Sequence, residues 1–193
     1  MNVKIIALGG GASNAVNQMI RAGDIAADFI AANTDVQDLK RSKAPTRLQV
    51  GAALVKGLGA GGDAEIGRAA AEADREAIAL VLAGAQLVIV VAALGGGTGS
   101  GGASVICQVA KAGGAVVVSV VTLPLPFEGR RRRMVADAAL TALDGSAPDR
   151  NVVVEIPIPP REDGVSLAGM FALTDAAVAA EVRSVISGGL PGA

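Results

Sequence analysis

Short apolar runs alternate with longer amphipathic stretches along almost the whole chain. The short runs are rich in β-branched residues and bounded by Gly, Asn, Pro or Asp, which is typical of strands buried on both faces of a sheet. The predicted strands are Val3 to Leu8, Phe29 to Ala32, Leu87 to Ala93, Val116 to Val121 and Val152 to Ile156. The predicted helices are Asn14 to Ala22, Ala64 to Ala83, Ala103 to Ala112, Met134 to Leu143 and Leu167 to Ser187. Because strands and helices alternate, we expect an α/β fold with a doubly wound parallel sheet.

The last predicted helix carries an apolar stripe. Phe171, Val178, Val182 and Val185 recur at a helical period, and Gly188 with the glycine after it offers a stop. We expect one domain over residues 1–187 and a short Gly/Pro tail over residues 188–193, and the stripe of the last helix then needs a cover.

Composition excludes several classes of protein. The 193 residues are 51% hydrophobic, enough for a substantial core, whereas aromatic residues make up only 2% and the net charge is −1. A nucleic-acid partner is therefore not expected, since bases would have almost nothing to stack on. No apolar run approaches the roughly 20 residues of a membrane span, so we expect a soluble, cytoplasmic protein.

The chain has no histidine and a single cysteine, Cys107, which is expected on a buried helix face. A disulfide within the chain, a zinc site, a catalytic triad and a histidine general base are all excluded by these counts.

A first glycine-rich segment, Gly9-Gly10-Gly11-Ala12-Ser13-Asn14, joins a predicted strand directly to a predicted helix. Unpaired backbone N–H groups and the positive end of a helix dipole would meet there and favour an anion. The segment departs from known phosphate loops, because Asn14 stands where a dinucleotide fingerprint has glycine and a Gly-Lys pair is missing. A ligand-free turn is the alternative.

A second segment, Gly95-Gly96-Gly97-Thr98-Gly99-Ser100-Gly101, follows the strand that ends at Ala93. Its glycines offer backbone donors to a phosphate chain, and Thr98 and Ser100 offer hydroxyl donors. A purely structural turn has no use for so many glycines, so this segment is the more specific signal.

A third segment, Gly57-Leu58-Gly59-Ala60-Gly61-Gly62-Asp63, precedes a predicted helix that has Glu65 in its first turn. One interpretation is a third set of backbone N–H donors, placed at a terminal phosphate. The other is a flexible loop in which Asp63 is an ordinary N-cap.

The residues from Gly96 to Gly101 spell GGTGSG, and four other blocks accompany them. These are Gly9-Gly10-Gly11 with Asn14-Ala15-Val16, Asn33-Thr34-Asp35 with Gln37, Gly57 to Gly61 with Glu65 and Gly67, and Val121-Thr122 with Pro124 and Phe127-Glu128-Gly129. In order and spacing the five blocks resemble the tubulin/FtsZ family of GTPases, and within it the bacterial cell-division members. The resemblance extends to about Ile186 and implies a Rossmann-like GTPase domain.

The resemblance implies that GTP or GDP binds with Mg²⁺, without a cluster of protein metal ligands. By position, Asn33 lies at the nucleotide, Glu128 and Arg132 reach the ribose, and Phe171 and Asp175 meet the guanine. A carboxylate suits guanine because it accepts from N1–H and the exocyclic amine together. The candidate nucleotide-binding residues are Gly9, Gly10, Gly11, Asn14, Asn33, Gly59, Ala60, Gly61, Gly95, Gly96, Gly97, Thr98, Gly99, Ser100, Glu128, Arg132, Phe171 and Asp175.

Four arginines, Arg130 to Arg133, begin the helix after the fourth predicted strand. Most of such a charge run is a solvated face. Cations at a helix N-terminus oppose its dipole, so we expect at least one, Arg132, to face an anion or a ribose oxygen.

Two departures from the family pattern affect the expected activity. The family reads Ile-Pro-Asn-Asp where this chain has Ile156-Pro157-Ile158-Pro159, so a nucleotide-contacting asparagine is missing and guanosine binding is expected to weaken. The sequence leaves open whether Arg161 substitutes for it. The chain also ends at Ala193, before the family's second domain and the loop whose carboxylates orient the attacking water in the next subunit. We therefore expect a filament-forming cell-division GTPase that hydrolyses GTP weakly, with self-association or a protein partner at the last helix.

Two other functions stay open. A dinucleotide-dependent oxidoreductase would hold a pyrophosphate on Gly9 to Asn14 and the ribose hydroxyls on Asp35, and it would leave the second glycine segment unexplained. A non-catalytic regulator would use the nucleotide only to fix its shape and would present the last helix to a partner.

Overall fold

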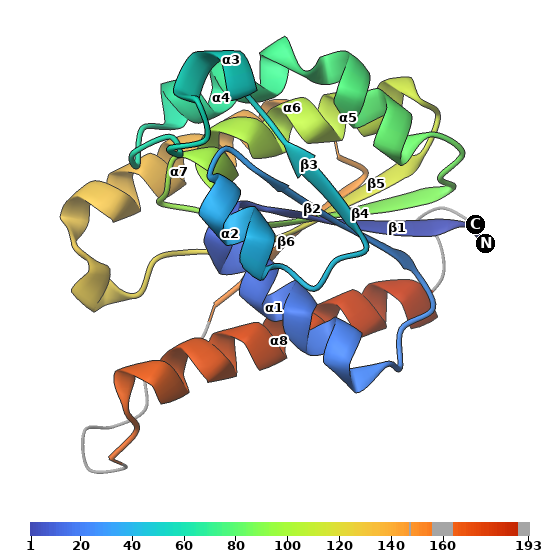
Figure 1. Ribbon diagram of the computed structural model, residues 1–193. Coiled ribbons are helices and arrows are strands. Elements are labelled where there is room, and N and C mark those ends of the chain that lie inside the picture. The colour runs from blue at the N-terminus through green and yellow to red at the C-terminus, as the bar shows by residue number, and fades with distance from the viewer. Residues whose placement is uncertain (147, 156–163, 189–193) are drawn as a thin grey trace.

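The computed structural model describes residues 1–146, 148–155 and 164–188. Within these residues one six-stranded sheet has the order β3-β2-β1-β4-β5-β6, and every neighbouring pair of strands is parallel (Figure 1). The strands are β1 (Val3–Leu8), β2 (Asp28–Asn33), β3 (Thr46–Gln49), β4 (Leu87–Ala93), β5 (Val116–Thr122) and β6 (Arg150–Val154). The expected doubly wound parallel sheet is confirmed.

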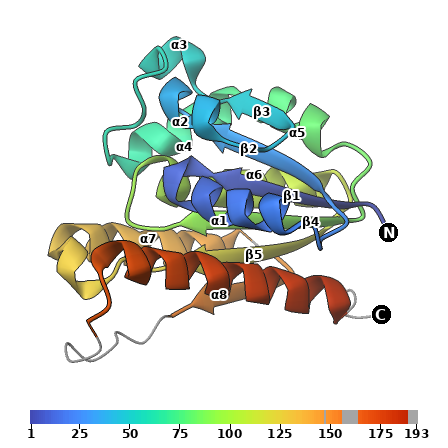
Figure 2. The same ribbon diagram turned by 60° about the horizontal axis from the view of Figure 1, so that its bottom comes forward.

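Helices cover both faces of the sheet, as Figures 1 and 2 show. One face is covered by α1 (Gly9–Ala22), α2 (Val36–Arg41) and α8 (Leu167–Ser187), and the other by α4 (Ala64–Ala73), α5 (Arg75–Leu82), α6 (Thr98–Ala112) and α7 (Arg130–Gly145). Two short elements lie in the connections, α3 (Ala52–Val55) and the 3-10 turn η1 (Pro126–Glu128). None of the helices in the described parts of the chain is long and apolar enough to cross a membrane.

The core has two halves because neighbouring side chains of a strand point to opposite faces. In β1, Ile5 and Ala7 pack with α1 and α8, whereas Ile6 and Leu8 pack with the helices of the other face. All four are buried. Cys107 on α6 is also buried, as expected, and this burial raises the pKa of its thiol to about 12. The apolar runs without alternation thus mark strands that are covered on both sides.

Helix α8 has the predicted bounds, and three residues of its apolar stripe are covered within the chain. Val178, Val182 and Val185 are buried in the half of the core that includes α1 and the sheet. The cover that the stripe requires is therefore supplied for these residues by the chain itself, because α8 packs back against α1. Phe171, by contrast, is 42% exposed near the start of the helix.

Several other elements differ from the expected ones: β6 begins at Arg150 and α7 at Arg130, each earlier than predicted, and α2 and α3 were not predicted. Helices α1 and α6 begin several residues earlier than predicted, inside the glycine-rich segments. The helix expected over Ala64 to Ala83 is interrupted at Asp74, which separates α4 from α5. Strand β3 was not predicted because its Thr-Arg-Leu-Gln sequence lacks an apolar run and lies at the sheet edge.

Candidate functional site

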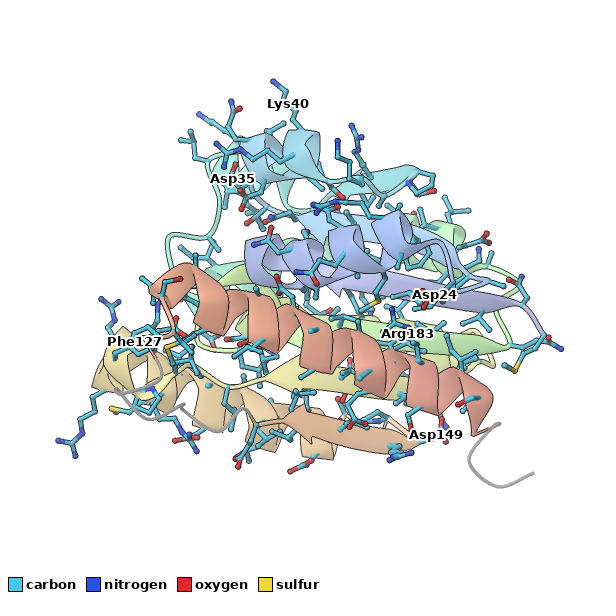
Figure 3. All side chains as sticks on the ribbon, turned by 90° about the horizontal axis from the view of Figure 1, so that it is seen from below. Asp24, Asp35, Lys40, Phe127, Asp149 and Arg183 are labelled. Carbon is cyan, nitrogen blue, oxygen red and sulfur yellow. The ribbon has the colours of Figure 1, made fainter. Side chains whose placement is uncertain are left out.

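A cleft of about 590 Å³ opens over the carboxyl ends of the central strands. The chain leaves β1 toward β2 and leaves β4 toward β5, so the connections diverge between the adjacent strands β1 and β4. Ligands of open α/β sheets bind at such a reversal. Asp35 from the β2 side and Phe127 from the β5 side lie toward the same end of the molecule, away from the Asp24–Arg183 pair (Figure 3).

The first glycine segment forms the start of α1 rather than a loop before it. Gly9 has φ of +83°, so the turn out of β1 requires a conformation that side chains rarely adopt. Leu8 is the N-cap, and no side chain of the described residues caps the helix. The first N–H groups of α1 therefore lack helical partners at the cleft, which is the geometry that the predicted anion site requires.

The second segment forms the start of α6 in the same way. Gly97 is the N-cap and supplies no side chain, and Gly96, Gly97, Thr98 and Gly99 line the cleft. The helix dipoles of α1 and α6 thus both direct their positive ends toward one cavity.

Ser100 and Gly95 do not line this cleft, in contrast to their predicted place among the phosphate-binding residues. The backbone N–H of Gly95 donates to Ser100 Oγ over 2.8 Å, and this contact is buried. Ser100 therefore shapes the turn, while its neighbour Thr98 reaches the cavity.

Some glycines of the second segment serve packing, which corrects the expectation that a structural turn has no use for them. A Cβ on Gly99 would lie 2.5 Å from the Ala93 carbonyl oxygen, and one on Gly101 would overlap the Ala64 backbone of α4. Helices α4 and α6 can approach this closely only because Gly101 has no side chain.

The third segment contacts the other two. Gly59, Ala60 and Gly61 line the cleft, and a Cβ on Gly97 would lie 2.7 Å from that of Ala60. Asp63 is the N-cap of α4, as one interpretation predicted, because its side chain accepts from the N–H groups of Glu65 and Ile66. The segment thus both lines the cavity and starts α4.

The residues after β2 join the third segment to the second. Val36 N donates to the Gly57 carbonyl over 3.1 Å, and Gly59 N donates to the Thr34 carbonyl over 3.3 Å. The hydroxyl oxygens of Thr34 and Thr98 share a buried hydrogen bond of 2.6 Å. Thr34 belongs to the Asn33-Thr34-Asp35 block but was not among the candidate nucleotide-binding residues.

Asn33 lines the cleft as predicted, together with a carboxylate that sequence reasoning missed. Asn33 Nδ2 donates to Asp38 Oδ2 over 3.4 Å, and Asp38 itself lines the cleft. The available signal was Asp35 followed three residues later by Asp38, since Asp35 caps α2 and places Asp38 in its first turn.

The other end of the cleft carries the predicted ribose and base residues. Arg132 Nη1 donates to Glu128 Oε2 over 2.7 Å, and both residues line the cavity. Phe171 meets Phe127 edge-on, with ring centroids 6.5 Å apart. The predicted anionic partner of Arg132 is thus a carboxylate of its own chain.

Asp175 lies at this end as well, half-buried on α8, together with Asn14 of α1. Burial raises the pKa of the Asp175 carboxyl to about 6. Its Oδ2 accepts a hydrogen bond from Gln18 Nε2 over 3.2 Å. A desolvated acceptor facing a cavity is suited to a ligand that presents N–H donors.

In the described part of the chain, no group of three or more acidic or cysteine side chains gathers as a metal site. The segment Ile156 to Arg161, with the predicted loss of asparagine at Ile158, lies outside the described residues.

A family model described as the GTPase domain of the Tubulin/FtsZ family matches residues 2–155. The chain belongs to the tubulin/FtsZ family. Within the family, it is 43% identical over 187 residues to the cell division protein FtsZ of Pseudomonas putida and 44% identical over 187 residues to that of Pseudomonas aeruginosa. These alignments cover 95% of this chain and only 46% and 47% of the two relatives, so the chain spans about half their length.

Solved structures agree with this assignment. An empty FtsZ dimer of M. jannaschii matches with a TM-score of 0.87 and 32% identity, over 96% of this chain and 54% of that one. CetZ2 from Haloferax volcanii, a protofilament with bound GTPγS, matches with a TM-score of 0.79 and 29% identity, over 94% and 57%. The tubulin/FtsZ resemblance and the fold are thereby confirmed.

Proposed function

We propose that this chain is the GTP-binding domain of an FtsZ-like, cytoplasmic cell-division GTPase that assembles into filaments. The observation that carries the proposal is the arrangement of the cleft. Two helices of more than three turns, α1 and α6, begin at its centre without side-chain caps, and the Asp175 carboxylate lies at its far end. An anionic chain with a donor-rich base fits these two features together.

In this proposal the phosphates contact Gly9 to Gly11 and Gly96 to Gly99, and the terminal phosphate meets residues 59–61. Glu128 and Arg132 bind the ribose hydroxyls, and Phe171 and Asp175 meet the guanine. The domain spans residues 1–187. The description of the matching family model as a GTPase domain and the GTPγS bound to CetZ2 support the choice of nucleotide.

Mg²⁺ fits this cleft as an ion that arrives with the nucleotide. Mg²⁺ sites of this kind combine phosphate oxygens and water with one or two carboxylates. Asp38, whose carboxylate lies beside Asn33 on the cleft wall, is the residue that we propose to hold it. The ion would neutralise the charge of the phosphates.

We further propose that the 193-residue chain by itself hydrolyses GTP to GDP and phosphate slowly. Hydrolysis needs a group that orients the attacking water. Every carboxylate that lines the described cleft already has another role: one caps α2, and the other three are proposed to bind Mg²⁺, the ribose and the guanine. These carboxylates are Asp35, Asp38, Glu128 and Asp175.

The oxidoreductase hypothesis loses support from Asp35. Its Oδ1 accepts from the N–H groups of Gln37 and Asp38 over 2.7 and 3.4 Å, so this carboxylate caps α2. A dinucleotide enzyme would need the same carboxylate for ribose hydroxyls.

The test is a titration of nucleotide-free protein with a fluorescent GTP analogue in Mg²⁺, with unlabelled GTP, ATP and NADH as competitors. We expect displacement by GTP alone. Equal displacement by GTP and ATP would contradict guanine recognition, displacement by NADH alone would revive the oxidoreductase, and no binding would contradict the proposal. Light scattering with GTP tests filament formation, and rapid phosphate release would contradict slow hydrolysis.

A further inference from the structure

Gln18 of α1 lies behind the base end of the cleft rather than in it. It follows Asn14 by four residues, so the two side chains project from the same face of the helix one turn apart. Asn14 lines the cavity and Gln18 does not. Gln18 therefore reaches the cavity only through a neighbouring side chain.

That neighbour is Asp175. Gln18 Nε2 donates to Asp175 Oδ2 over 3.2 Å, across 157 positions of sequence. Within the described residues, no other group hydrogen-bonds this carboxylate. The contact depends on the packing of α1 against α8, in which Ala15 and Val178 share one half of the core.

The hydrogen bond restricts a group that would otherwise rotate. A carboxylate turns readily about its last bond, because sp³–sp² torsions are broad. Guanine presents N1–H and the exocyclic amine side by side, so both carboxylate oxygens must lie in the plane of the base. A donor fixed to Oδ2 from behind selects that rotation and leaves acceptor capacity for the ligand, since each oxygen has two lone pairs.

The position of Gln18 suits the charge that recognition requires. Asp175 is half-buried, and burial disfavours the ionised form of a carboxyl. A hydrogen bond from a neutral amide favours the ionised form without supplying a competing charge.

We propose that Gln18 is a positioning residue for base selection, which acts through Asp175 to favour guanine over bases that lack its pair of adjacent donors. The inference rests on the proposed GTP binding, which it deepens. It assigns guanine discrimination to a contact between two helices in addition to the residues that touch the base.

The test compares GTP with inosine triphosphate, which keeps N1–H and lacks the exocyclic amine. The variants are Gln18→Met, which keeps the length and loses the donor, and Gln18→Lys, which keeps a donor at similar reach. Gln108→Met is the matched control, because Gln108 is an exposed helical glutamine that contacts Arg75 and does not line the cleft.

We expect Gln18→Met to weaken GTP binding about fivefold and inosine triphosphate binding less, so that the ratio of the two affinities falls. Gln18→Lys and Gln108→Met should keep the wild-type ratio. A merely structural role would weaken both nucleotides equally. If Gln18→Met fails to fold by thermal melting, Gln18→Ala, which removes the donor without adding a charge beside Asp175, replaces it with the same expected direction.

An unchanged ratio in Gln18→Met, or an equal fall in Gln108→Met, would overturn the inference while leaving GTP binding intact. A wild-type protein that binds GTP without preferring it to inosine triphosphate would also overturn it. Failure of the wild-type protein to bind GTP would refute the proposed function, and the inference with it.

Discussion

The side-chain hydroxyl oxygens of Thr34 and Thr98 lie 2.6 Å apart in a buried hydrogen bond. Thr34 follows β2 and Thr98 begins α6, so this bond joins the end of β2 to the second glycine segment, and both residues line the cleft. Replacing one partner leaves the other buried and unpaired, which is the costly case for hydrogen bonds.

We therefore expect Thr34→Val to lower the free energy of unfolding by about 1–3 kcal/mol. The double variant Thr34→Val with Thr98→Val should lose less than the sum of the two single variants, measured by urea unfolding. Thr141→Val on exposed α7 is the control, because its hydroxyl contacts only the Asp137 carbonyl of its own helix. Additive losses would show that the two hydroxyls do not interact.

Gly101 is predicted to be essential for packing. Gly101→Ala would place a methyl group against the Ala64 carbonyl and the Arg68 amide of α4, and we expect a loss of about 1–3 kcal/mol. Gly145→Ala in α7 meets nothing within 4 Å, and we expect it to be neutral or stabilising by up to about 1 kcal/mol. Thermal melting measures both, and equal behaviour of the two variants would contradict the close packing of α4 and α6.

GTP binding is predicted to weaken in acid. Burial raises the pKa of Asp175 to about 6, and guanine needs the ionised acceptor, so affinity should fall as pH drops through that value. Asp175→Asn should bind GTP at least about tenfold more weakly at neutral pH and should lose this pH dependence, measured by fluorescence titration. A wild-type affinity that stays flat between neutral and acid pH would contradict this role.

The same carboxyl has the opposite effect on the stability of the nucleotide-free protein. Its folded pKa lies above the ordinary value of 3.8, so the folded state binds the proton more tightly than the unfolded state. The contribution of Asp175 should therefore destabilise the fold as pH rises from 3.8 to about 6. Unfolding of Asp175→Asn across this range should lack that contribution.

Arg132 is predicted to act on the nucleotide rather than on stability. Its ion pair with Glu128 is partly exposed, so Arg132→Met should change the free energy of unfolding by less than about 1 kcal/mol. GTP affinity should fall about tenfold, since a hydrogen bond from a charged group to the ribose is lost. Arg133→Met is the control, because Arg133 pairs with Asp137 and does not line the cleft. Equal effects of the two variants on GTP affinity would show that Arg132 does not contact the nucleotide.

The sequence alone determined the elements whose character is local. The bounds of β1 and β4 follow from runs of apolar residues, interrupted only by Lys4 in β1, that polar residues or glycine delimit. Helix α8 was recognisable from its helical period. The glycine segments, Asn33, and the residues Glu128, Arg132, Phe171 and Asp175 were predictable because their order and spacing match a known family.

Only the tertiary structure decided the remaining features, because they depend on contacts between residues far apart in sequence. No local pattern could show that the Ser100 hydroxyl accepts a hydrogen bond from the Gly95 N–H. Nor could it show that α4 lies too close to position 101 for a side chain. The Gln18–Asp175 contact and the burial of Val182 likewise exist because α8 returns to pack against α1. The tendency of a segment to form a helix or strand depends on neighbouring residues. The pairing of polar groups far apart in sequence is fixed only when the helices pack.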